Sequence, residues 1–511
     1  MNPAMLLRGG LVADGIGTTV QRADMLIEGP AITAVGNVEV PSGECAVLDL
    51  APGSVVCPGF IDAHVHAEGP LLADGRVAGA LAQGVTTLVV GQDGESWIGA
   101  SADTVRYLNR YFAPVNGALE PVRDFGVAGF REAAAGRLAQ NVAVLASQGT
   151  IRHNVAGMAP GPLGEAERAA ARRQVEDALA EGAVGLSSGL DYLPSRFGGM
   201  EETAEIALPL ADADRPYVSH LRGYGPDVRA GLAELVAVGA GAGARVHASH
   251  LWGEPADIEA ALTAADAAGV PVTYDMYSYR RSSTILAQLL LPPEVQAGGP
   301  GHTLAALTDP GQRAELLDGE KLTEGYLHNV YLGTVPGDMA GLAGLSVAEA
   351  AARDARPPGE WVLDLLVAAD LNVGGHLDRL VLTDDCLAWI AAHDRHCAGS
   401  DGIYQGQHPH PRGYAAFAGH YLGAGPETGY QQLARHLAAN AADAYGLRNR
   451  GRIAAGKAAD LCVIGAAGLA ARASYDRPRE LATGIDYVFV NGVIVWPDAA
   501  AAGQRPGQVV S

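Results

Sequence analysis

Short apolar segments alternate with Ala-rich stretches through the middle of the chain. Residues 85–90 form a continuous apolar run, as expected of a strand that is buried on both faces of a parallel sheet. Residues 165–181 are rich in Ala, Arg and Glu and predict a helix. Strands are predicted at 246–250 and 272–275, with an Ala-rich helix at 258–268 between them. Repeated strand-then-helix units predict an α/β fold, either a parallel barrel or a doubly wound sheet.

The two ends of the chain have a different pattern, with brief β-rich segments punctuated by glycine. Residues 25–36 show it near the start, and 459–464 and 487–495 show it near the end, where Asn491-Gly492 is a strong hairpin signal. We therefore predict one small β-sandwich built from both termini.

These patterns divide the chain into three predicted parts. Residues 1–57 and 447–511 would form the two parts of the β-sandwich, and 58–446 the α/β domain. Residues 285–345 break the strand–helix rhythm with Pro, Gly and mixed helix, and are expected to be an irregular insertion.

Composition narrows the class of protein. The chain has 511 residues, 48% of them hydrophobic and 18% charged, which is typical of a globular protein with a large domain and a satellite. A formal net charge of −22 argues against nucleic acid or an anionic membrane as a partner. The five cysteines are scattered and show no Cys-x-x-Cys spacing, and no signal peptide or apolar run of about 20 residues is evident. We expect a cytoplasmic location.

One apolar run ends in two histidines that are a single residue apart. His64 and His66 follow Pro58-Gly59-Phe60-Ile61-Asp62-Ala63. On a strand, residues i and i+2 point to the same side, so both imidazoles can face one point beyond the strand's end. This geometry suits a metal ion.

Other polar residues occur where later strands are predicted to end. Asp93 follows the strand at 85–90, His220 and His250 end two further strands, and Asp401 lies in Gly399-Ser400-Asp401-Gly402. Each could be an ordinary core histidine or turn aspartate, and His247 is expected to face away from the site. In a β/α barrel, however, all strands open on one face at their C-terminal ends, where these groups would converge with the first two histidines. Nitrogen and oxygen ligands of this kind suit zinc or a similar divalent ion.

These motifs resemble the amidohydrolase superfamily, and more closely its N-acyl-D-amino-acid deacylase (D-aminoacylase) branch. The matching segments are Pro58–His66, Gly84–Thr87, Gly185–Tyr192, Ser219–Arg222, Ser249–Leu251, Asp275–Tyr279, Gly399–Gly402, His408–Arg412 and Arg450–Leu461. The resemblance implies a (β/α)8 TIM-type barrel with the small β-sandwich domain. It implies metal-dependent hydrolysis of amide C–N bonds, with Zn²⁺ as one or two ions, Mn²⁺ or Co²⁺ as alternatives, and a small-molecule amide as substrate. The chain could also assemble as a homo-oligomer, because the sequence does not fix its oligomeric state.

The chain departs from the branch at one metal ligand. The family usually carries Cys after the second strand, where this chain has Gly91-Gln92-Asp93-Gly94. A carboxylated lysine is excluded as a bridging ligand, because the only lysines are Lys321 and Lys457. No lysine or cysteine lies between His66 and His220, so any bridging ligand must be a carboxylate, with Asp93 as first choice and Glu95 as second. A harder oxygen ligand should make the site more tolerant of manganese or cobalt.

A second departure concerns the substrate's carboxylate. The family often has a lysine two residues after the second Ser-His histidine, and here that residue is Trp252. The resemblance leaves Tyr192, Tyr277 and Arg412 as substrate contacts, and Arg280 or Arg281 as a substitute for the lysine. Asp401 is the expected general base as well as a metal ligand.

Three functions compete. The leading one is deacylation of N-acyl-D-amino acids or related N-acyl compounds. The alternative is ring opening of a cyclic amide, as in hydantoinases and dihydroorotases, which the loss of the lysine makes more credible. A non-catalytic scaffold is disfavoured, because the chain keeps every histidine and the late aspartate.

Overall fold

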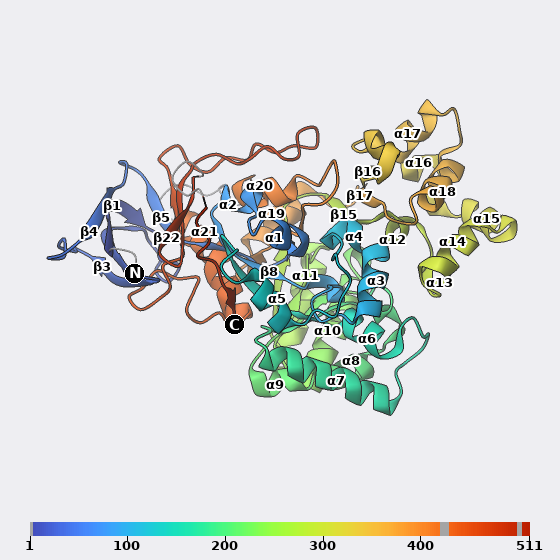
Figure 1. The fold of residues 1–511 in the computed structure, drawn as a ribbon, viewed down its shortest axis with the longest axis horizontal. Coiled ribbons are helices and arrows are strands. Elements are labelled where there is room, and N and C mark those ends of the chain that lie inside the picture. The colour runs from blue at the N-terminus through green and yellow to red at the C-terminus, as the bar shows by residue number, and fades with distance from the viewer. Residues whose placement is uncertain (1–3, 420–428, 498–502) are drawn as a thin grey trace.

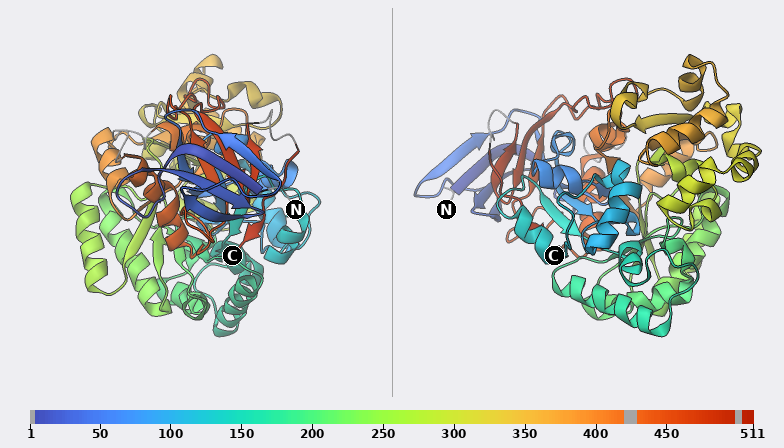
Figure 2. Two further views of the ribbon diagram at one scale, coloured as in Figure 1. Left: turned by 90° about the vertical axis from the view of Figure 1, so that its left-hand side faces the viewer. Right: turned by 45° about the vertical axis from the view of Figure 1, so that its right-hand side comes forward.

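Strands from both ends of the chain lie together at one side of the molecule, beside a larger body of strands and helices (Figure 1). The computed structural model describes residues 4–419, 429–497 and 503–511. Helices between about 286 and 368 project on the side opposite the terminal strands (Figure 2).

The terminal strands form a single eight-stranded sheet in the order β22-β21-β20-β5-β1-β2-β3, with β4 paired to β1. Its strands are β1 (Ala4–Val12), β2 (Gln21–Glu28), β3 (Ala31–Gly36), β4 (Cys45–Asp49), β5 (Val55–Pro58), β20 (Leu461–Ile464), β21 (Ile485–Val490) and β22 (Val493–Trp496). The two ends of the chain meet where Cys462 of β20 pairs with Cys57 of β5. The predicted hairpin is confirmed: Asn491 and Gly492 both have positive φ, as the tight turn between β21 and β22 requires.

Parallel strands form the centre of the larger body. They are β6 (Phe60–Asp62), β8 (Val85–Val90), β9 (Asn141–Val144), β10 (Ala146–Ser147), β11 (Leu186–Gly189), β12 (Tyr217–His220), β13 (Val246–Ala248), β14 (Val272–Met276), β18 (His396–Ala398) and β23 (Val509–Val510). They lie in two sheets, ordered β23-β9-β8-β6 and β10-β11-β12-β13-β14-β18. The two-stranded pair of β7 (Val65–His66) and β19 (Gly402–Ile403) lies at the strand ends.

β23 pairs with β9 and not with the terminal sheet. The end of the 447–511 segment therefore packs against the parallel strands.

Helices follow the parallel strands and cover them. The predicted helices at 165–181 and 258–268 are confirmed as α7 (Glu165–Ala180) and α11 (Pro255–Ala267). The other helices outside the projecting segment are α1 (Glu68–Ala73), α2 (Ala78–Leu81), α3 (Ala102–Tyr111), α4 (Ala113–Asn116), α5 (Val127–Ala134), α6 (Gln148–Ala156), α8 (Met200–Ala207), α9 (Pro209–Ala213), α10 (Val228–Ala242), α19 (Asp384–Ala392), α20 (Arg412–Gly419), α21 (Gly429–Ala434) and α22 (Asn440–Ala444). α11 buries Ile258, Leu262 and Ala265, the spacing of one helix face. None of the helices in the described ranges combines the length and apolar character needed to cross a bilayer.

The irregular segment is longer than the sequence predicted. It contains a three-stranded antiparallel sheet, β15-β17-β16, in which β15 (Arg281–Ile285) pairs with β17 (Gly374–Asp378). β16 (Val330–Thr334) and the helices α12 (Leu286–Leu290), α13 (Pro293–Gln296), α14 (Pro300–Thr308), α15 (Pro310–Leu317), α16 (Glu324–Leu327), α17 (Val347–Arg353) and α18 (Pro358–Ala368) complete it. The segment thus runs from about 281 to 378, and it ends next to the site described below.

Candidate active site

Six of the predicted residues meet at the C-terminal ends of the parallel strands. They are His64 and His66 after β6, Asp93 after β8, His220 at the end of β12, His250 after β13 and Asp401 after β18. The backbone N–H of Asp401 donates a 2.7 Å hydrogen bond to the carbonyl of His64, which joins the last of these strand ends to the first.

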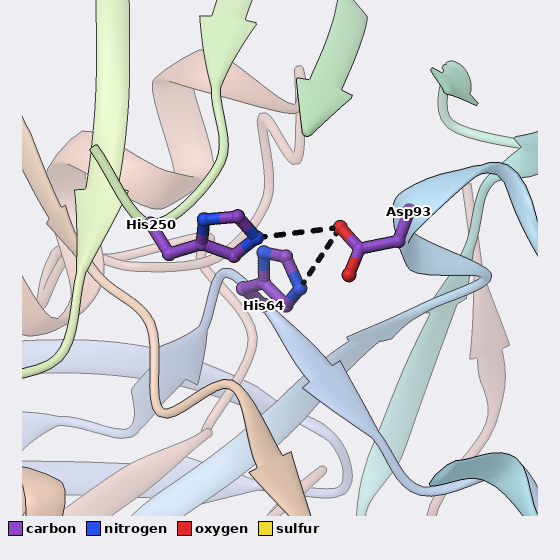
Figure 3. A group of neighbouring side chains, drawn as sticks. All are labelled: His64, Asp93 and His250. Carbon is purple, nitrogen blue, oxygen red and sulfur yellow. Dashed lines mark ion pairs between the residues drawn. The ribbon is translucent and has the colours of Figure 1, made fainter. Parts of the chain in front are cut away.

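The carboxylate of Asp93 lies between three imidazoles. Its Oδ1 is 3.5 Å from His64 Nε2 and 3.6 Å from His250 Nε2 (Figure 3). Its Oδ2 is 3.5 Å from His66 Nε2. All four side chains are buried. His64 Nε2 and Asp93 Oδ1 have no hydrogen-bond partner, and orphaned buried polar atoms are costly unless something else satisfies them. The arrangement fits a bound cation.

A second group shares His64 with the first. Asp401 Oδ1 lies 3.5 Å from His66 Nε2 and 3.8 Å from His64 Nε2. The ligand atoms of His64, Asp93 and His250, and those of His64, His66 and Asp401, each lie within 4.8 Å of one another. Two overlapping nitrogen-and-oxygen groups suit one or two ions of the zinc type.

His220 lies at the edge of these groups. Its Nδ1 is 3.0 Å from His250 Nε2 and 3.9 Å from Asp93 Oδ2, while its Nε2 is 3.9 Å from Asp191 Oδ2. The structure therefore brings His220 to the site but outside both three-residue groups.

Glu95, the second choice for a bridging carboxylate, belongs to neither group. Both of its carboxylate oxygens are buried and unpartnered, and burial, together with the charge of Asp93, raises its pKa well above the usual range. The geometry favours Asp93.

Three of the site residues have an unusual backbone. Asp93, His250 and Asp401 have φ of 57°, 35° and 47°, in the left-handed region that residues with a side chain rarely adopt. Such residues cost about 1–3 kcal/mol each and persist where the surroundings hold them in place. All three residues with this backbone conformation contribute a ligand atom to the two groups.

The carboxylates control the protonation of the histidines. Burial alone would favour neutral imidazoles, but Asp275, Asp93 and Asp401 outweigh it and raise the pKa of His64 to about 9. For His66, Asp401 and Asp93 likewise overcome burial and raise its pKa to about 10. In turn, the histidines overcome the effect of burial on Asp93 and hold its pKa well below the usual range.

A second layer of side chains orients the histidines. Asp275 Oδ2 lies 3.4 Å from His64 Nδ1 and 3.1 Å from His247 Nε2, and Asp275 Oδ1 accepts a bond from the backbone N–H of His250. Asn116 Oδ1 lies 2.9 Å from His66 Nδ1. When each Nδ1 carries the proton, Nε2 is left free to bind a metal, as outer partners of ligating histidines commonly arrange.

Sequence reasoning did not identify these two orienting residues. Asp275 lies in β14, so the strand-end pattern that located the other residues applied to it as well. Asn116 ends α4, where no sequence pattern points to it. His247, which was expected to face away from the site, contacts Asp275.

Two residues predicted to contact the substrate, Arg412 and Arg280, are not among those that line the cavity at the site. Arg412 is fully buried and pairs with the proposed base, with Nη2 2.8 Å from Asp401 Oδ2. Arg280 is exposed and does not line the cavity at the site.

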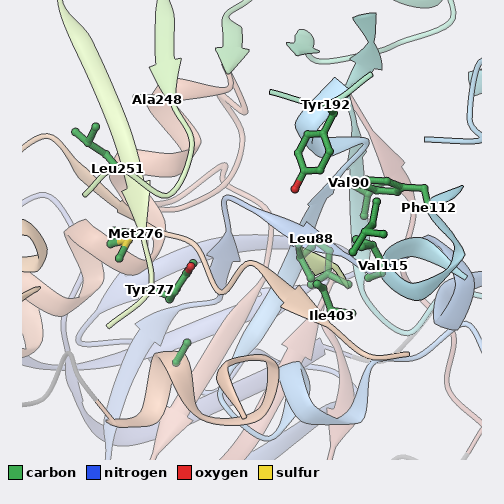
Figure 4. Packing of buried hydrophobic residues seen from close by; sticks show 14 of the residues in the cluster. Leu88, Val90, Phe112, Val115, Tyr192, Ala248, Leu251, Met276, Tyr277 and Ile403 are labelled. Carbon is green, nitrogen blue, oxygen red and sulfur yellow. The ribbon is translucent and has the colours of Figure 1, made fainter. Parts of the chain in front are cut away.

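A cavity of about 560 Å³ opens above the histidines. The predicted residues Tyr192, Trp252 and Tyr277 line it, together with His66, Asp93, His220, His250 and Asp401. The hydroxyls of Tyr192 and Tyr277 point into the space between them (Figure 4). The cavity wall also includes Asp191, Arg196, Lys321 and Arg379, which the sequence did not single out.

Comparison with known proteins gives concordant matches. Residues 337–496 match the profile of the amidohydrolase family. The N-acyl-D-glutamate deacylase of Alcaligenes xylosoxydans xylosoxydans is 31% identical over 529 residues, which cover 99% of this chain and 96% of that protein. A structure of D-aminoacylase, described for its binuclear metal centre, superposes with a TM-score of 0.83 at 27% identity, and covers all of both chains. The N-acyl-D-glutamate deacylase of Bordetella bronchiseptica, solved with zinc and a phosphonate that mimics the tetrahedral intermediate, gives 0.82 at 26%, again over all of both chains.

Proposed function

The chain belongs to the amidohydrolase superfamily, in its N-acyl-D-amino-acid deacylase branch, and we propose from that membership that it hydrolyses the amide bond of N-acyl-D-amino acids or related N-acyl compounds. The observation that carries the proposal is the pair of overlapping ligand groups at the floor of the cavity. Full-length relatives are deacylases, which favours this function over ring opening of a cyclic amide.

The metal would be zinc, as one or two ions. The residues that would hold it are His64, His66, Asp93, His220, His250 and Asp401, with Asp93 in the bridging position. When bound, a divalent ion lowers the pKa of a water molecule toward ~7 and polarises the scissile carbonyl. Manganese and cobalt are alternatives to zinc, because the carboxylate oxygen of Asp93 is a harder ligand than a cysteine sulfur.

Asp401 would act as the general base. Its carboxylate lies beside His66, and although burial favours the acid form, Arg412 and the histidines keep its pKa below the usual value. It is therefore ionised at neutral pH and able to take a proton from the attacking water and return it to the leaving nitrogen. Arg412 holds Oδ2 of the carboxylate, while Oδ1 faces His66.

The tyrosines would position the substrate. Tyr192 hydrogen-bonds Thr284 Oγ1 at 2.8 Å, and its hydroxyl faces the cavity, where it can donate to the developing oxyanion. Tyr277 and Trp252 would contact the remainder of the substrate from the other wall.

The finer architecture is part of the same proposal. We infer that β6, β8, β9 with β10, β11, β12, β13, β14 and β18 close into a (β/α)8 TIM-type barrel. The backbone N–H of Ala63, after β6, donates a hydrogen bond to the carbonyl of Ala398 in β18, which connects the outer strands of the two sheets. The backbone N–H of Leu145, between β9 and β10, donates one to the carbonyl of Val90 in β8 and supports the join between the sheets. The terminal sheet would be the small β-sandwich, with 1–57 and the part of 447–511 that ends with β22 as its two parts. β23, at the end of 447–511, would instead join the barrel domain of 58–446. A cytoplasmic location and a homo-oligomer remain predictions.

Replacing Asp401 with Asn tests the proposal. The variant should retain most of its metal, because five other ligand candidates remain, and should lose about 10²- to 10⁴-fold in kcat. Hydrolysis of N-acetyl-D-amino acids is measured beside their L-enantiomers and hydantoins, with metal content by atomic emission. Asp370→Asn, at an exposed site paired with Arg110, is the matched control. Full activity in Asp401→Asn would overturn the assignment of the base.

A further inference from the structure

A loop of the terminal sheet reaches the irregular segment beside the site. The loop lies between β20 and β21, and its Tyr475 is half-buried. The guanidinium carbon of Arg281 in β15 lies 4.0 Å from the centre of the Tyr475 ring and 3.8 Å from that of Tyr331 in β16. A guanidinium between two aromatic faces is attracted to both of them. Tyr475 therefore joins the terminal sheet to the three-stranded sheet of the irregular segment.

The hydroxyl of Tyr475 contacts a buried histidine. His410 is fully buried, and its Nδ1 accepts a 3.1 Å hydrogen bond from the backbone N–H of Arg412, the first residue of α20. Burial, followed by the charge of Arg412, holds the pKa of His410 well below its usual range, so the ring is neutral. Its single proton is then on Nε2, which lies 3.3 Å from the hydroxyl oxygen of Tyr475 and donates to it. Tyr475 thus fixes the tautomer of His410 that binds the backbone of Arg412.

Arg412 connects this histidine to the proposed base. A single nitrogen, Nη2, lies 2.8 Å from Asp401 Oδ2 and donates a 3.3 Å hydrogen bond to the carbonyl of Ser283 in β15. Ser283 lines the cavity and belongs to the same strand as the arginine that stacks on Tyr475. Tyr475 is therefore connected to Asp401 by two routes, one through His410 and one through β15.

We propose that Tyr475 is a positioning residue for the general base Asp401, although it is not among the residues that line the cavity. The inference rests on the proposed function and adds to it a residue from the loop of the terminal sheet. The hydroxyl of Tyr475 keeps the start of α20, and with it the guanidinium of Arg412, in the place that orients the carboxylate. Its ring keeps β15 against the same guanidinium. A small displacement of a reacting group slows the chemical step, because the step depends on close alignment of the reacting atoms.

Tyr475→Phe tests the hydroxyl alone, because this variant keeps the ring. In the metal-loaded enzyme, kcat for an N-acetyl-D-amino acid should fall about 10- to 100-fold, while KM stays within about twofold of the native value. Tyr475→Leu removes the ring as well and should also raise KM about 3- to 10-fold, because Ser282, Ser283 and Thr284 of β15 line the cavity. Tyr487→Phe, in β21 of the terminal sheet, is the matched control and should leave both constants unchanged.

Hydrogen exchange provides a second readout that does not depend on turnover. Tyr475→Phe should speed exchange of the amides at the start of α20 about tenfold, measured by mass spectrometry on a peptide that covers residues 408–415, and leave exchange in β21 unchanged. Native kcat in Tyr475→Phe with faster exchange at α20 would overturn the positioning role, as would an equal loss of kcat in Tyr487→Phe. Faster exchange at α20 in a protein whose native form hydrolyses no N-acetyl-D-amino acid would instead count against the proposed reaction.

Discussion

Loading the site with a divalent ion should expel protons from His64 and His66. In the metal-free protein, the neighbouring carboxylates raise their pKa values to about 9 and about 10. Both imidazoles are therefore cationic at pH 7, with a proton on each ring nitrogen. A metal ion binds the deprotonated nitrogen, and it must displace these protons. His250 has a lowered pKa, with burial as the main cause, and should release none.

The two pKa values set the size of the effect. Each displaced proton changes the apparent affinity up to tenfold per pH unit, about 1.4 kcal/mol. With two protons, the affinity should rise up to about 100-fold between pH 7 and 8, which is about 2.7 kcal/mol. After burial, which opposes protonation, Asp275 is the largest influence on the pKa of His64. Asp275→Asn should therefore reduce the release toward one proton.

Calorimetric titration of the metal-free protein with Zn²⁺ measures the release directly. Titrations in two buffers of different ionisation enthalpy give the number of protons, and chelator competition between about pH 6.5 and 8 gives the slope of the affinity. Asp370→Asn serves as a control, because this exposed carboxylate pairs with Arg110 and not with a residue of the site. A zinc affinity that does not change with pH, without proton release, would refute the conclusion that His64 and His66 are cationic in the metal-free protein.

Three further predictions concern residues around the site and the core. Asn116→Leu removes the acceptor at His66 Nδ1 and should weaken zinc binding about 10- to 100-fold in chelator competition, whereas unchanged affinity would count against the orienting role. Burial, helped by His436, lowers the pKa of His396 to about 3, so the native protein resists a proton that the unfolded chain takes up near pH 6.5. Stability should fall as pH drops below about 6.5, by up to ~1.4 kcal/mol per unit from this group, and urea unfolding should show a shallower fall in His396→Gln; equal slopes would contradict it. Arg152→Met leaves Glu202 buried without its 3.0 Å partner and should cost about 3–5 kcal/mol in urea unfolding, and a loss below about 1 kcal/mol would contradict this.

The convergence of the site could be predicted from the sequence because it depends on strand ends. A polar residue directly after a buried parallel strand has its direction set by the strand. His64, Asp93, His250 and Asp401 are found this way, although more than 300 residues separate the first from the last. The Asn-Gly hairpin is also local, since two residues with positive φ suffice to form it.

Features that depend on distant pairing could not be predicted. The irregular segment extends to 378 because Ile285 of β15 pairs with Gly374 of β17, and no local pattern announces a partner so far along the chain. Arg379 reaches the cavity only through that sheet. The ion pair of the buried Arg412 with Asp401 was likewise not predictable, because no local pattern in the sequence identifies the partner of an arginine.

The left-handed backbone at Asp93, His250 and Asp401 has a consequence for protein engineering. Glycine adopts this conformation freely, so it would relieve strain of about 1–3 kcal/mol at each position. A variant library screened for thermal resistance alone would thus accumulate substitutions that remove a carboxylate or an imidazole from the site. Thermostable descendants of this chain should therefore be selected for turnover in the same round, with these three codons held constant.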